Sequence, residues 1–389
     1  MKDKIVSILI LLVIIIFIVL SLDVFGIISL PEKISLKTYL PNSVEVASLG
    51  GKDEVYYPDY NAIGIQTLQK STSSTSQNSV DMSGIISSNE TGETRFENNI
   101  TDNSFYYNQL DLYGKTIYSK LYENLDNLKT GEYVVDFGTT FNDLLQNDDG
   151  NAKLTDSFQL SINALLLDHP EIFYLDITKM YLFTKSTSTI RGTTYRISIG
   201  PDEGNNYLLE GFNSKSDVLI AEDEINTILY SIKERVSGNI VEQIKQVHNI
   251  IIDSVNYDSD SKTDLSHGIY GAFINKLAVC DGYAKAFKYI LDNLGISCVE
   301  VCGVAKNSSG ETESHAWNDV LINGSWYAID VTWDDPIIIG GSGILSDDLR
   351  YNYFLKGSDT FYSHHQEDGN IVSNGTFEYP ILNKNGLYQ

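Results

Sequence analysis

The chain has 389 residues, of which 42% are hydrophobic, so it can bury an ordinary globular core and has room for two domains. Its formal net charge is −25 at pH 7. This acidity argues against binding to nucleic acid or to anionic lipid, because both need a clustered basic surface, and we expect no nucleic-acid partner.

An uncharged apolar run occupies residues 5–22. In a helix, at about 1.5 Å per residue, this run matches the thickness of a bilayer core. Lys2 and Lys4 precede it and predict that the short N-terminal side is cytoplasmic, with the bulk of the chain extracellular. The alternative is a signal peptide and a secreted protein, but the sequence VFG at 24–26 matches a cleavage site poorly. We therefore predict a cytoplasmic stub and single-pass membrane anchor over residues 1–30.

The next part of the chain, residues 31–105, is mostly polar and rich in serine, threonine and asparagine. Such a composition cannot bury enough apolar surface to fold. It predicts a disordered linker between the membrane and the folded part.

Residues 106–220 are predicted to form a small α+β domain. Helical periodicity covers 106–125, and a second helix should end before Pro170 and be followed by a strand. Alternating stretches at 179–186, 193–200 and 205–212 predict a small antiparallel sheet. We interpret His169 as a capping or packing residue. No chemistry is assigned to this domain; binding to cell-wall material is one hypothesis for it.

The second predicted domain covers residues 221–389. Two amphipathic helices, at 222–236 and 239–255, precede the stretch LAVCDGYAKAFKYILDNLG at 277–295. Apolar residues recur in this stretch at helical spacing, and Gly295 can cap its end. Cys280 therefore lies at or just before the first turn of a helix, where unpaired N–H groups and the helix dipole favour a thiolate.

The other two cysteines, Cys298 and Cys302, lie in a stretch that alternates like a strand. At about 3.3 Å per residue their Cα atoms would be roughly 13 Å apart, which is too far for a disulfide. We expect both to be free strand thiols.

A β-hairpin is predicted in SHAWNDVLINGSWYAIDVTWDDP, residues 314–336, because Asn323-Gly324 is a strong turn signal. A two-residue turn pairs Ile322 with Ser325, and this register would place His315 opposite Thr332. Side-chain alternation then gives two faces. One is a core face, with Ala316, Val320, Ile322, Tyr327, Ile329 and Val331. The other carries His315, Trp317, Trp326 and Asp330.

On that second face, His315 and Asp330 become diagonal neighbours, with Cβ atoms about 7 Å apart. Together with Cys280 they supply a nucleophile, a base and a group that orients the base. The thiol would pass its proton to His315, and Asp330 would hold the other ring nitrogen and stabilise the imidazolium.

Three blocks, CDGYAKAF at 280–287, the hairpin at 314–336 and YNYFL at 351–355, resemble the bacterial branch of the transglutaminase-like superfamily. The resemblance covers roughly residues 240–356. It implies an α+β fold of papain type, in which the helix bearing the cysteine packs on an antiparallel sheet, here preceded by the small α+β domain and the transmembrane helix. It also implies that Cys280, His315 and Asp330 are catalytic and transfer an acyl group through a thioester.

The acceptor of that acyl group separates two alternatives. Water would make the protein a cysteine peptidase, and a lysine amine would make it a transglutaminase. In both cases the expected substrate is a peptide or protein amide, with cell-wall-associated material as one candidate. A third alternative is a catalytically silent scaffold or binding module at the cell surface.

No cofactor or metal is expected. Residues 257–269 begin like a calcium loop, with Asp258 and Asp260, but Lys262 and Ile269 stand at ligand positions. The histidines and cysteines also lack the spacing of a zinc site. The backbone N–H of Cys280 is the first candidate for an oxyanion donor, and no residue is assigned as the second.

Overall fold

The structure is a computed structural model that describes the backbone of residues 44–48 and residues 104–259, 263–306, 312–335, 350–368 and 377–388. The predicted membrane anchor at 5–22 lies outside these residues, as does most of the predicted linker. In the described part of the chain, no helix combines the length and apolarity needed to cross a bilayer.

The described chain is a mixed α+β structure, as predicted. Its helices are η4 (Tyr107–Gln109), α2 (Leu112–Glu123), α3 (Leu125–Leu128), η5 (Leu144–Gln146), α4 (Gly150–Asp168), η6 (Ile177–Lys179), α5 (Lys215–Lys233), α6 (Ile240–Ser254), η7 (Asp264–His267), the π-helix η8 (Gly271–Asn275), α7 (Cys280–Asn293) and α9 (Ser358–Phe361). Its strands are β1 (Val44–Ser48), β2 (Val135–Gly138), β3 (Tyr181–Thr189), β4 (Gly192–Gly200), β5 (Asn256–Tyr257), β6 (Leu277–Ala278), β7 (Cys298–Lys306), β8 (Thr312–Ile322), β9 (Ser325–Ile329) and β10 (His365–Glu367).

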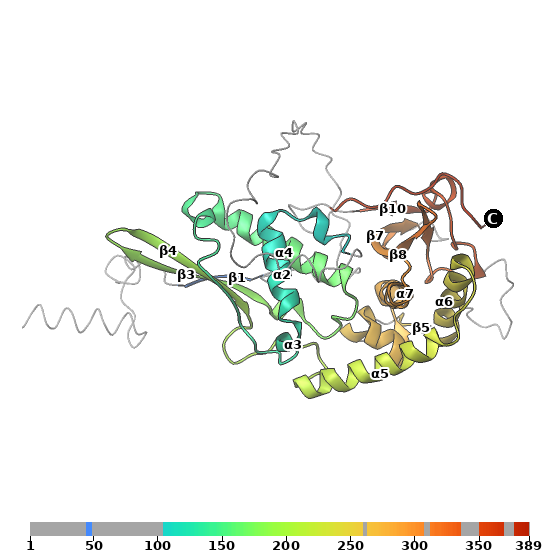
Figure 1. Ribbon diagram of the computed structural model, residues 1–389, viewed down its shortest axis with the longest axis horizontal. Coiled ribbons are helices and arrows are strands. Elements are labelled where there is room, and N and C mark those ends of the chain that lie inside the picture. Colours follow the sequence, from blue (N-terminus) through green and yellow to red (C-terminus); the bar gives the residue numbers. More distant parts are fainter. Residues whose placement is uncertain are drawn as a thin grey trace, which may run out of the picture.

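The first sheet is antiparallel, with strand order β1-β3-β4-β2. The predicted strands at 179–186 and 193–200 are confirmed as β3 and β4, which form an antiparallel hairpin; helices α2 and α4 lie beside it (Figure 1). Strand β1 falls inside the stretch 31–105 for which we expected no folded structure; its sequence VEVAS alternates as a strand does.

Two predicted strands of this unit are wrong. The segment after Pro170 and the segment 205–212 form turns that meet in one isolated bridge, Leu175 with Leu208. The side chain of Asn206 accepts the backbone N–H of Leu208 at 3.0 Å, which competes with a regular ladder.

The predicted interpretation of His169 agrees with the structure, where it is the C-cap of α4 and is buried. Its Nδ1 lies 2.9 Å from a carboxylate oxygen of Glu171, and its ring packs against Tyr122 with centroids 4.5 Å apart.

Helix α5 runs through the predicted boundary at 220/221, because Ser214 caps it by accepting the N–H of Asp217. The two units also share one continuous hydrophobic core. At their junction, the rings of Phe173 and Tyr270 stack 5.9 Å apart. The boundary is therefore an interface across which the chain packs.

The second sheet is antiparallel, with order β10-β7-β8-β9, and α7 packs beside β7 and β8 (Figure 1). Helix α7 buries Phe287, Ile290 and Leu291 completely, as its apolar periodicity predicts. Cys298 and Cys302 lie on β7 and do not form a disulfide, as predicted. This packing of a cysteine-bearing helix on an antiparallel sheet positions the site described next.

Candidate active site

Cys280 is the first residue of α7, which confirms its predicted place at a helix start. Val279 precedes it in an extended conformation and provides no side-chain cap. The first N–H groups of the helix have no backbone acceptor within it, although that of Gly282 donates to Oδ1 of Asp281 at 3.0 Å, and the dipole's positive end lies at the thiol. Cys280 is 5% exposed, so its surroundings are mainly protein groups.

The start of α7 is fixed by a buried ionic network around Asp281. One oxygen of Asp281 lies 2.9 Å from Nδ1 of His267, and the other accepts Nζ of Lys285 at 3.0 Å. Lys285 also donates to the carbonyl oxygen of His267 at 2.9 Å. These bonds tie the first turn of the helix to η7 and leave Cys280 little freedom to move.

Gly282 permits this close approach. A Cβ atom at this position would lie 2.2 Å from the carbonyl oxygen of Ser266 and 2.8 Å from Cβ of Ala278. The backbone at Ser266 can therefore come this close to the helix start only because position 282 has no side chain.

His315 and Asp330 are brought together. Nε2 of His315 lies 2.7 Å from Oδ2 of Asp330, and both side chains are buried. The register of the β8–β9 hairpin is the predicted one, with Ile322 opposite Ser325 and positive φ angles at Asn323 and Gly324.

The hairpin is shorter than predicted, however. Strand β9 ends at Ile329, so His315 does not face Thr332 and instead pairs with Gly303 of β7. The cause is Asp330 itself, whose Oδ1 accepts the N–H of Trp333 at 3.0 Å and so turns the chain. On the predicted second face, His315, Trp317 and Asp330 are buried and Trp326 is half-buried.

The charges of this pair are strongly coupled. Burial alone would lower the pKa of His315, but the charge and hydrogen bond of Asp330, together with a hydrogen bond from the Cys280 side chain, raise it to about 10. Burial would raise the pKa of Asp330, yet His315 and His365 hold it well below its usual range. The arrangement therefore favours an imidazolium between a carboxylate and a thiol.

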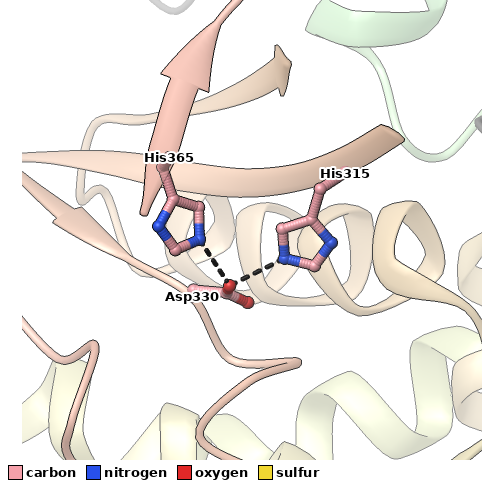
Figure 2. Close-up of side chains that lie close together, drawn as sticks. All are labelled: His315, Asp330 and His365. Carbon is pink, nitrogen blue, oxygen red and sulfur yellow. Dashed lines mark hydrogen bonds and ion pairs between the residues drawn. The ribbon is translucent and has the colours of Figure 1, made fainter. Parts of the chain in front are cut away.

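His365 was missed by the sequence reasoning. It lies on β10, and its Nε2 lies 3.0 Å from the same Oδ2 atom that contacts His315. Figure 2 shows both imidazoles pointing at this single oxygen. The available signal was the pair of adjacent histidines at 364–365, shortly after the YNYFL block.

Tyr257 was also missed. It pairs with Ala278 in the short parallel ladder of β5 and β6, which ends two residues before Cys280. The pKa of its hydroxyl is raised by burial and then by the charge of Cys280. A phenol at this place can donate a hydrogen bond to a group bound at the sulfur.

In the described residues, one group of side chains has the composition and spacing that could hold a metal ion: His315, Asp330 and His365, with ligand atoms within 4.8 Å of one another. The absence of a metal remains a prediction.

A cavity among the described residues lies elsewhere. It has a volume of about 540 Å³ and is lined at one side by Tyr289, Asp292 and Asn293, at the far end of α7. Asp292 is 12 residues from Cys280, which is about 18 Å along a helix. This cavity is therefore separate from the chemistry proposed below.

Comparison with known proteins connects this geometry to a family. Residues 228–331 match the family model described as the Transglutaminase-like superfamily. The Kyphoscoliosis peptidase of Mus musculus is 23% identical over 168 residues, which are 40% of this chain and 24% of that protein. The Kyphoscoliosis peptidase of Homo sapiens is 33% identical over 93 residues, 22% of this chain and 13% of that protein. The chain thus spans less than a quarter of the length of these relatives.

Solved structures give weaker similarities. The crystal structure of a TGase covers 43% of this chain and 48% of that chain, with 16% identity and a TM-score of 0.28. The structure of a putative cysteine protease from Cytophaga hutchinsonii covers 38% of this chain and 61% of that chain, with 14% identity and a TM-score of 0.25.

Proposed function

Since residues 228–331 carry a domain of the transglutaminase-like superfamily, we propose that this protein is a cysteine acyl-transfer enzyme acting on peptide or protein amides. The observation that carries the proposal is the position of His315. Its Nε2 lies 2.7 Å from Oδ2 of Asp330. A hydrogen bond with the Cys280 side chain also raises the pKa of the His315 ring. A thiol, an imidazole and a carboxylate in this order are the parts of a nucleophilic site.

The proposed reaction begins from an ion pair in which His315 already holds the proton given up by Cys280 and the sulfur is a thiolate. The thiolate attacks the carbonyl carbon of the amide, and the imidazolium gives its proton to the leaving amine as the C–N bond breaks. A thioester on Cys280 remains. Water, deprotonated by His315, then releases a carboxylate, or a lysine amine attacks in its place and forms a new amide.

The oxyanion of the tetrahedral intermediate needs hydrogen-bond donors. The backbone N–H of Cys280, at the first position of α7, is the first donor that we propose. The hydroxyl of Tyr257, whose titration is influenced by Cys280, is the second. Both come from elements that meet at β6, so their positions are fixed by the same short ladder.

The location that we propose is the outer side of a membrane, with residues 5–22 as the anchor. Support comes from the uncharged run itself and from the lysines before it. Fractionation of cells that produce the full chain, followed by protease treatment of intact cells, tests this. Recovery of the protein in the soluble cytoplasmic fraction would contradict it.

Activity can be tested with the full-length protein, a glutamine-containing protein substrate and a fluorescent primary amine. Incorporated amine indicates transamidation, new N-termini indicate peptidase activity, and conversion of glutamine to glutamate indicates deamidation. Each should be lost in Cys280→Ala and kept in Cys298→Ala, which removes a free thiol elsewhere in the same domain. Equal results for the parent and Cys280→Ala on a broad peptide library would reject the proposal in favour of the scaffold alternative.

A further inference from the structure

A second histidine shares the carboxylate of Asp330, and it lies outside the matched residues 228–331. We propose that His365 is a positioning residue: its Nε2–H donates to Oδ2 of Asp330 and holds the carboxylate in the orientation that His315 requires. This inference rests on the proposed function, because the base whose orientation matters is the one next to Cys280.

The sheet is built to let this side chain reach the site. His365 pairs with Ala305 and His315 pairs with Gly303. Both histidines therefore lie on the same face of the sheet, and their partners on β7 between them are small. A Cβ atom at position 303 would lie 2.2 Å from the backbone oxygen of Gln366 and 2.5 Å from the ring of Trp317. Only glycine there allows β10 and the aromatic ring to come this close.

Packing fixes the ring of His365. Phe361 stacks on it with centroids 4.0 Å apart and an interplanar angle of 15°. Trp333 and Trp317 contact it at 4.7 Å and 5.1 Å between centroids. The side chain is fully buried, so its orientation is determined by these neighbours and by the bond to Asp330.

The protonation of the ring follows from its surroundings. Burial lowers the pKa of His365, although Asp330 opposes this, so the imidazole is neutral near pH 7 and carries one N–H. An unprotonated nitrogen 3.0 Å from an ionised carboxylate oxygen would be repelled, so the proton belongs on Nε2. Asp330 therefore accepts from His315, His365 and the N–H of Trp333 at once.

Hydrogen bonds fit these distances better than a metal ion does. Two ligands on a tetrahedral ion, each about 2.0 Å from it, stand about 3.3 Å apart. The N–O distances from Asp330 Oδ2 to His315 and His365 are 2.7 and 3.0 Å, in the range of charge-assisted hydrogen bonds. The distances among these three side chains are thus those of hydrogen bonds.

The role predicts a specific pattern among variants of the full-length protein. His365→Phe keeps a ring against Phe361 but removes the donor, and it should slow alkylation of Cys280 by iodoacetamide at pH 7 by roughly 10-fold and shift the rate profile toward higher pH. His365→Gln places an N–H donor near the position of Nε2 and should restore most of the rate. His364→Phe, at the exposed neighbouring histidine, is the matched control and should resemble the parent.

The outcomes separate this inference from the proposed function. A parent protein whose Cys280 reacts like an isolated thiol would reject the proposed function. A reactive parent with an unchanged His365→Phe profile would reject the positioning role alone, as would a His365→Gln profile equal to that of His365→Phe in a folded protein.

A second measurement covers the case in which the phenylalanine variant does not fold. Long-range ¹H–¹⁵N spectra of the ¹⁵N-histidine-labelled parent, assigned with His365→Gln, report which ring nitrogen carries the proton. We expect a protonated Nε2 on His365 from pH 6 to 8. A proton on Nδ1 with a bare Nε2 would overturn the inference.

Discussion

Replacing Asp330 by asparagine removes the charge on which the site depends while keeping its shape. Asp330 and Cys280 together raise the pKa of His315 against the effect of burial, from 6.5 to about 10, a difference of roughly 3.5 units. That corresponds to about 5 kcal/mol in favour of the imidazolium. In Asp330→Asn only burial and the thiol act on the ring, so we expect a neutral imidazole at pH 7 and a Cys280 thiol without a cationic partner.

The expected loss of reactivity can be stated. An isolated thiol is only about 3% ionised at pH 7, whereas a cysteine paired with an imidazolium is almost fully ionised at this pH. Alkylation of Cys280 at pH 7 should therefore slow by about 30-fold or more in Asp330→Asn. A 30-fold change in rate corresponds to about 2 kcal/mol. The stabilisation of the imidazolium, about 5 kcal/mol, exceeds this value, so loss of the ion pair is sufficient to cause the expected 30-fold decrease.

Alkylation rates between pH 5 and 9, mapped after tryptic digestion, measure this effect. Residues 277–285 form a tryptic peptide with Cys280 alone, and Cys298 and Cys302 share the peptide 289–306, so exposure of the latter reports unfolding. Asp334→Asn is the matched control, because Asp334 forms a separate buried pair with His248 at 3.0 Å. Coincident profiles for the parent and Asp330→Asn would refute the reasoning.

The same variant has a stability signature. The folded-state pKa of His315 is raised, so its contribution to stability is complete below pH 6.5 and is lost as the pH rises toward about 10. Urea denaturation should show the advantage of the parent over Asp330→Asn shrinking across that interval. A difference that grows with pH would contradict the sign.

The remaining predictions concern other parts of the site. Tyr257→Phe should lower the rate of acyl transfer by roughly 100-fold and leave iodoacetamide alkylation of Cys280 unchanged, because alkylation forms no oxyanion; a parallel loss in both assays would contradict an oxyanion role. Gly282→Ala should lower the free energy of unfolding by about 3 kcal/mol, because the added methyl group would overlap the backbone of Ser266. Gly295→Ala should lower it by about 1 kcal/mol, because the space there is open and only the positive φ is strained. Equal losses in urea denaturation would show that the loop adjusts. Prolonged treatment with EDTA should leave acyl transfer unchanged, and recovery of lost activity by added zinc or calcium would overturn the prediction of no metal.

The local parts of the site could be predicted from sequence. The place of Cys280 at a helix start follows from apolar periodicity, and the hairpin register follows from Asn323-Gly324, because both signals act over a few neighbouring residues. The contact of His315 with Asp330 followed from that register, although β9 ends one residue before the aspartate. The side chain of Asp330 accepts the backbone N–H of Trp333, and this bond, which alternation cannot reveal, ends the strand there.

The non-local parts could not be predicted. His365 reaches Asp330 only because β10 pairs with β7, and the order of strands in a sheet is decided by packing between distant segments. Alternation also could not say which of two adjacent histidines points inward. Tyr257 depends likewise on the parallel pairing of two-residue strands, which are too short to leave a pattern.

The position of β10 in the chain has a consequence for biosynthesis. During translation, α7 and the β8–β9 hairpin leave the ribosome before residue 365 does, so Cys280 and His315 exist for a time without the strand that completes the sheet edge. If His365 holds Asp330 as we propose, a nascent chain in that interval carries a weakly reactive thiol. The nucleophile would then reach full reactivity only after residue 365 has joined the sheet through β10, so the thiol would stay weakly reactive while the site is incomplete.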